Sequence, residues 1–175
     1  SSSSAASDVY KRQILAIRDQ KKLFPNISST LCIATLLEDE ITTYNLGNSR
    51  AYRFRDGVLL QLTKDQTKVQ QLYDMGLISE NQIYSHPEKN IISGYVGCDG
   101  FDSKRIDVIT HRERFRRNDM LMLCSDGVSD YINIDEIENA LIMDGELSKK
   151  ADAIIDKIYS NGAGDNISLI LVNKL

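Results

Sequence analysis

Apolar and polar positions along the first half of the chain follow the short period of β-strands. Residues 30–37 (TLCIATLL) form a continuous apolar run, which is typical of a buried strand. Further strand-like segments follow at 41–46, 49–54 and 58–62, with Asp56-Gly57 as the clearest hairpin turn between them. Because the connections are short, the pattern predicts an antiparallel meander.

Helical spacing replaces this pattern after the fourth strand. Apolar residues within 69–73 predict a short helix that ends at Gly76. Ser79 and Gln82 have the spacing of a capping box for a second short helix, which Pro87 ends.

The second half mixes both patterns. Residues 90–96 and 105–110 are predicted as strands, 111–117 (HRERFRR) as a charged loop, and 119–124 as a buried strand. Two amphipathic helices and a final strand then follow. The first helix begins at a capping box of Asn133 and Glu136, the second has apolar positions spaced from Leu147 to Ile158, and the strand covers 167–172. The class is therefore α+β with antiparallel sheets.

The beginning of the chain differs from the rest. Residues 14–24 are predicted as the tail of a helix that Pro25 ends. Residues 1–13 (SSSSAASDVYKRQ) show neither the hydrophobic period of a helix nor that of a strand. We interpret them as a leader that is non-native or disordered. The domain then covers residues 14–175, and we expect it to lack an N-terminal portion.

Composition excludes several classes of protein. With 175 residues, 42% apolar and 26% charged, the chain suits one soluble domain. A net charge of −4 disfavours nucleic acid as a partner, and no apolar run reaches the roughly 20 residues of a membrane span. The three cysteines lie far apart, which indicates neither disulfides nor a zinc knuckle and favours a reducing, cytoplasmic compartment.

Two aspartates lie in glycine-bearing turns at the ends of predicted strands. Asp126 follows the strand at 119–124, with Asp130 four residues later, and Asp165 precedes the strand at 167–172. Asn48 occupies a third such turn. Carboxylate and amide oxygens are ligands that Mg²⁺ and Mn²⁺ prefer. Each residue could equally be a turn former or a helix cap, and spacing alone leaves both interpretations open.

Two alternative catalytic chemistries are excluded by inspection of the motifs. A cysteine-based phosphatase needs Cys-x5-Arg, but none of Cys32, Cys98 and Cys124 has an arginine six residues later. An Asp-x-Asp nucleophile motif is also absent, since Gly127 and Val128 follow Asp126.

Three ordered motifs resemble the metal-dependent Ser/Thr protein phosphatases, the PPM or type 2C family. They are NLGNSRAYRFRDGVLLQLTKDQT (45–67), LMLCSDGVSD (121–130) and GAGDNISLILV (162–172). Residues 69–92 are similar to the flap segment of bacterial members. The resemblance covers about residues 29–172, most of the chain.

The resemblance implies a sandwich of two antiparallel β-sheets flanked by helices, with two Mn²⁺ or Mg²⁺ ions at one end. Asp126 and Asp165 would bind the metal pair, Asp130 would help to bind a weak third metal, and Asn48 would be a weak ligand there. The matching motif positions that bind no metal are Gly47, Ser49, Arg50, Gly127 and Asn166. The implied reaction is hydrolysis of phosphoserine or phosphothreonine in proteins by a metal-activated water. The implied partners are phosphorylated proteins and a Ser/Thr kinase that shares them.

The chain departs from the family pattern at four points. The N-terminal Asp-Gly-x-Gly-Gly motif, which supplies a metal-bridging carboxylate, and the phosphate-binding arginine near the family's N-terminus are both absent from the sequence. Asn48 stands where the family has Asp, and Gln66 stands where bacterial members usually have His. Two hypotheses remain open at this point: a fragment of an active phosphatase, or an inactive PPM-like module that binds a partner protein or phosphoprotein.

Overall fold

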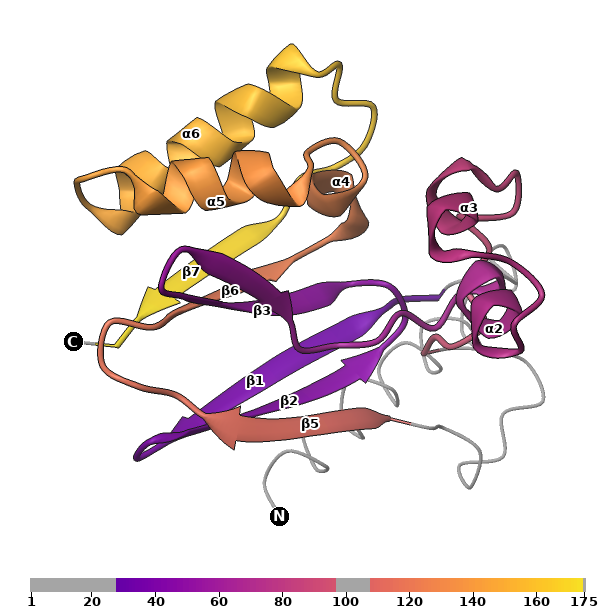
Figure 1. Ribbon diagram of the computed structural model, residues 1–175, viewed down its shortest axis with the longest axis horizontal. Helices are drawn as coiled ribbons and strands as arrows, with labels where there is room; N and C mark the ends of the chain where they lie inside the picture. Colours follow the sequence, from indigo (N-terminus) through magenta and orange to yellow (C-terminus); the bar gives the residue numbers. More distant parts are fainter. Residues whose placement is uncertain (1–27, 97–107, 175) are drawn as a thin grey trace, which may run out of the picture.

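The computed structural model describes residues 28–96 and 108–174. Two antiparallel sheets pack face to face, and a helix pair covers the outer face of one sheet (Figure 1). The first sheet has the order β1 (Leu31–Leu37), β2 (Glu40–Leu46), β5 (Ile109–Arg114), and the second has β4 (Val58–Gln61), β3 (Arg50–Arg55), β6 (Met120–Cys124), β7 (Leu169–Asn173). The predicted α+β sandwich is confirmed.

The predicted four-strand meander is wrong, because the chain changes sheets between β2 and β3. The change occurs at Gly47, whose φ is +108°, in the left-handed region. A Cβ atom there would lie 2.4 Å from Cγ2 of Thr30. Glycine is required for both reasons, and the turn leaves Asn48 at the end of the sandwich.

The charged segment 111–117 was predicted as a loop, but its first four residues belong to β5. Exposure alternates along β5, with His111 and Glu113 on the less exposed face. Glu113 pairs with Arg53 of β3 in the facing sheet at 3.1 Å. Because charged residues take the inward positions, the period of two was invisible in the hydrophobic pattern.

Two other strand predictions need correction. Segment 90–96 forms only isolated bridges, from Ile92 to Thr67 and from Val96 to Ser29, and is not a strand. β1 is a half-exposed edge strand of the described sheet rather than a buried strand, and its Leu37 is 72% exposed.

The described helices are α2 (Lys68–Asp74), α3 (Glu80–Ser85), α4 (Asp126–Ser129), α5 (Ile134–Ile142) and α6 (Leu147–Ser160). All but α4 agree with the sequence prediction, which placed a glycine-bearing turn at that position. Both predicted capping boxes are present, at Ser79 and at Asn133. None of these helices combines the length and apolar character needed to cross a bilayer. The predicted leader and the helix at 14–24 lie outside the described residues.

The core has two main parts, which fix the position of β6 between them. α5 and α6 pack their apolar faces, including Ile137, Ile154 and Ile158, on the outer face of the second sheet. Ile41 and Leu121 belong to the cluster between the two sheets. β6 is hydrogen-bonded on both edges, to β3 and β7, and is therefore a rigid support for the residues at its end.

Candidate metal centre at the end of the sandwich

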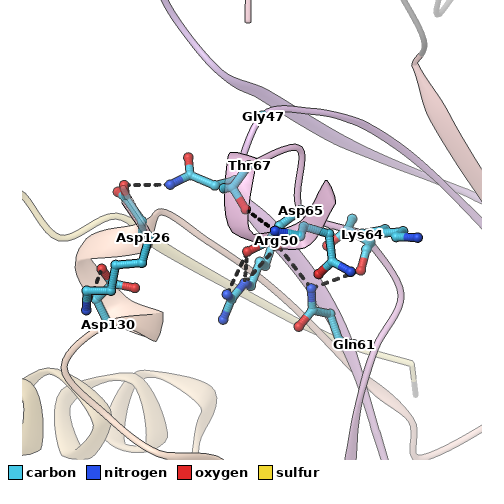
Figure 2. A network of polar contacts seen from close by, with 12 residues as sticks. Gly47, Arg50, Gln61, Lys64, Asp65, Thr67, Asp126 and Asp130 are labelled. Atoms are coloured by element: carbon cyan, nitrogen blue, oxygen red, sulfur yellow. Dashed lines mark hydrogen bonds and ion pairs between the residues drawn. The ribbon is translucent and has the colours of Figure 1, made fainter. Parts of the chain in front are cut away.

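Asp126 and Asp130 are held by a short helix at the end of β6. β6 ends at Cys124, Ser125 is the N-cap of α4, Asp126 is its first residue and Asp130 its C-cap. The backbone amide of Asp130 donates to the Asp126 carbonyl at 2.9 Å. Both carboxylates therefore belong to one turn of backbone, next to each other in space (Figure 2).

The turn between β2 and β3 brings Asn48 to the same place. Nδ2 of Asn48 donates a hydrogen bond to Oδ2 of Asp126 at 2.9 Å, as the dashed line to Asp126 in Figure 2 shows. In this orientation the amide nitrogen, not the oxygen, faces the carboxylate. Asn48 thus positions Asp126, and its role as a weak metal ligand stays a prediction.

The Asp165 loop packs against the start of α4. A Cβ atom on Gly127 would lie 2.2 Å from the Asn166 carbonyl oxygen and 3.6 Å from Cβ of Asp165. The Ser125 amide donates to the Ser168 carbonyl at 3.0 Å, which joins the two segments just before α4 begins. Asp165 accepts a hydrogen bond from the Asn166 amide at 2.7 Å. The structure therefore brings together the segments of both predicted ligands.

A cavity of about 380 Å³ lies in front of these residues. Asn48, Asp126 and Asp130 line it, whereas Asp165 does not. The opposite wall comes from α2, α3 and the loop after α3, including Tyr84 and Lys89.

The donor atoms suit a hard divalent cation in chemistry but form an incomplete set. Asp126 and Asp130 offer carboxylate oxygens to one cavity, which is the donor type that Mn²⁺ and Mg²⁺ select. Across residues 28–96 and 108–174, no three His, Cys, Asp or Glu side chains come close enough to hold a metal ion. A complete centre needs at least one further carboxylate.

Arg50 forms the floor between the candidate ligands and the core. Its guanidinium binds both oxygens of Asp65, at 2.6 Å from Nη2 to Oδ2 and 3.0 Å from Nε to Oδ1 (Figure 2). Nη1 donates to the Tyr52 hydroxyl at 3.2 Å. Burial lowers the pKa of Arg50, but the hydrogen bond to Asp65 and the nearby acidic groups outweigh it, so that the net pKa is raised. The motif arginine is thus occupied by an internal partner.

Two charged groups near the site were not singled out by the sequence. Lys89, in the loop after α3, lies 3.8 Å from Asp130. Asp65, just before α2, is the partner of Arg50. Sequence spacing alone did not indicate the Lys89–Asp130 and Arg50–Asp65 pairs, because tertiary packing brings their members together.

The surroundings of Asp130 raise the pKa of its carboxyl group. Partial burial is the main cause, and the negative charges of Asp126 and Asp65 add to it. The positive charges of Lys89 and Arg50 oppose the shift.

The described cysteines are unsuited to nucleophilic chemistry. Cys32 is in β1 and Cys124 in β6, and burial raises the pKa of each thiol to about 12. Both thiols are therefore protonated at neutral pH and inert. This agrees with the absence of a Cys-x5-Arg motif.

Comparisons with known proteins find similar serine/threonine phosphatases. The chain is 33% identical over 163 residues to the serine/threonine phosphatase Stp of Listeria welshimeri, covering 93% of this chain and 63% of that protein. It is 32% identical over 161 residues to the serine/threonine protein phosphatase PstP of Mycobacterium tuberculosis, covering 90% of this chain and 30% of that protein. The crystal structure of the M. tuberculosis phosphatase PstP/Ppp matches with a TM-score of 0.88 at 28% identity, over 98% of this chain and 71% of that one.

These matches support membership of the PPM (type 2C) family of Ser/Thr protein phosphatases. No protein-family model matches it. A PstP catalytic domain in complex with two manganese ions matches this chain with a TM-score of 0.78 at 26% identity, over 92% of this chain and 65% of that one. The chain spans less than two thirds of the length of its Listeria relatives.

Proposed function

We propose that the protein hydrolyses phosphoserine and phosphothreonine in proteins at a Mn²⁺ or Mg²⁺ centre. The observation that carries the proposal is the meeting of Asn48, Asp126 and Asp130, from distant parts of the chain, at one cavity on a rigid strand end. The homologous phosphatases named above support it. Phosphorylated proteins, a Ser/Thr kinase that shares them as substrates, and a cytoplasmic location belong to the same proposal.

Each residue has a proposed part in this reaction. Asp126 and Asp165 would hold the two metals, which when bound would supply an activated water and neutralise phosphoryl oxygens. Asp130 would contribute to a weak third metal position. Asn48 orients Asp126 by its hydrogen bond, and the Arg50–Asp65 pair holds the turn on which Asn48 lies. The described residues place no third carboxylate beside Asp126 and Asp130.

Hydrolysis of a phosphothreonine peptide in Mn²⁺ tests the proposal. We expect turnover by the full-length protein that EDTA abolishes and that Asp126→Asn reduces by at least about 100-fold, because this carboxylate touches the metal. Asp156→Asn, an exposed carboxylate on α6, is the matched control and leaves the rate unchanged. Metal-independent turnover, or an Asp126→Asn variant with full activity, would contradict the proposal. Complete inactivity would favour the partner-binding module.

A further inference from the structure

A second cavity opens beside the candidate metal centre. It has a volume of about 400 Å³ and is lined by residues of α3, of the α4–α5 connection and of β3. It shares five lining residues with the first cavity, Arg50, Gln61, Tyr84, Ser129 and Asp130. The two cavities therefore adjoin across the Arg50 and Asp130 side chains. Figure 1 shows α3 and α4 on facing sides of this region.

The walls that belong to the second cavity alone combine isoleucine and tyrosine side chains with Asn133, Glu136 and Asn161. Tyr52 and Ile137 are each 1% exposed and Ile132 is 6% exposed, so they form a packed floor. Ile134, the first residue of α5, lines the rim and is 42% exposed. The exposed part of this side chain offers apolar surface to a ligand.

Several polar groups in the walls already have partners within the protein, whereas the buried Ser129 hydroxyl has none among the described residues. Arg50 binds Asp65 and Tyr52, and Gln61 donates to the Thr63 carbonyl at 2.9 Å. Glu136 completes the capping box of α5. A ligand in this cavity can therefore gain from burying apolar surface, and the Ser129 hydroxyl is a wall group still open to a new hydrogen bond.

We propose that the second cavity is an apolar subsite for a phosphoprotein substrate. It receives an aromatic or branched aliphatic side chain that lies close in sequence to the phosphorylated residue. The inference rests on the proposed function, because the adjoining cavity is where the phosphorylated residue would bind. The volume is within the roughly 300–1,000 Å³ range of small-ligand pockets, which is ample for one such side chain.

Phosphothreonine peptides that differ at one flanking residue test the proposal. The full-length protein in Mn²⁺ is given peptides in which Phe, Leu or Ala occupies each flanking position in turn. At one position we expect Phe or Leu to raise kcat/KM by roughly tenfold over Ala, as one well-buried apolar group does in enzyme specificity. Ile134→Ser should reduce that ratio to near one.

A matched control comes from the other end of the same helix. Ile142 is 59% exposed, lies at the last residue of α5, and does not line the cavity. Ile142→Ser should keep the full tenfold ratio. Ile134→Ala serves as a second variant if Ile134→Ser fails to fold, as judged by its thermal unfolding.

The outcomes separate this inference from the proposed function. Turnover that is indifferent to the flanking residue, or a preference that survives substitution of Ile134, overturns the subsite and leaves the phosphatase activity standing. No turnover of any peptide overturns the proposed function. In that case the fluorescence anisotropy of the labelled peptides decides the subsite. Tighter binding of the Phe or Leu peptide, lost in Ile134→Ser, supports it, and equal affinities overturn it.

Discussion

Gly127 shows how one residue sets the distance between two segments that carry candidate ligands. Its backbone touches the Asn166 carbonyl, where a Cβ atom would lie only 2.2 Å away. We expect Gly127→Ala to force α4 and the Asp165 loop apart, to cost about 1–3 kcal/mol of unfolding free energy and to reduce activity. Urea unfolding measures the loss of unfolding free energy. Gly76→Asn is the control, because nothing lies near that position and asparagine tolerates its positive φ. Equal stability of both variants would contradict the close contact.

Arg50 and Asp65 provide a second test at the residue scale. Their side chains are 17% and 11% exposed, so removal of one charge leaves the other poorly solvated. Asp65→Asn should cost about 3 kcal/mol. Asp74→Asn breaks a much more exposed pair with Lys64 and should cost less than about 1 kcal/mol. Chemical denaturation of the two variants compares them, and similar losses would mean that the Arg50 pair stabilises no more than a surface pair.

At the scale of elements, one ion pair ties the β5–β6 connection to β3. Arg55 of β3 binds the Asp119 carboxylate, with 2.6 Å between Nη2 and Oδ2, and also donates to the Arg114 carbonyl at 2.8 Å. Burial raises the pKa of Asp119, but hydrogen bonds from Arg55 and from the Arg116 amide outweigh it, so the net pKa is lowered. Asp119 therefore stabilises the fold while it is ionised.

The sign of the pH dependence follows from this lowered pKa. The stabilisation is fully present above about pH 4, the ordinary pKa of an aspartate, and is lost as the pH falls through the lower native value. Asp119→Asn should therefore destabilise the protein at pH 7, and the difference from the wild type should shrink below about pH 4. Thermal unfolding of the variant and the wild type across this pH range measures the difference in their stability. Asp39→Asn removes a fully exposed carboxylate and should have little effect at any pH. A difference that grows on acidification would contradict the account.

A comparison of α5 with β5 shows why the sequence predicted some parts of the fold and not others. Helices with a capping box and an apolar stripe, such as α5, were predicted because local signals suffice. β5 was missed because its inward residues are charged and depend on partners in the other sheet, as Glu113 depends on Arg53. The change of sheets at Gly47 was missed for a similar reason, since a short turn specifies a reversal but not which strands pair afterwards.

At the scale of the whole molecule, the sandwich serves as a frame for residues at one of its ends. Asn48 follows a strand of the first sheet, while Asp126 and Asp165 lie beside strands of the second, and packing of the two sheets brings these turns together. The family motifs indicated these residues, but only the fold provides the Asn48–Asp126 hydrogen bond and the cavity before them. Metal binding at this end is the central claim.

Calorimetric titration of the full-length protein with Mn²⁺ tests that claim most directly, because it requires no substrate. Asp126→Asn should weaken Mn²⁺ binding by at least about tenfold, since it removes a carboxylate that we place on the metal. Asp156→Asn, on the exposed face of α6, should bind Mn²⁺ like the wild type. Equal Mn²⁺ affinity of the wild type and Asp126→Asn would contradict a metal centre at the end of β6.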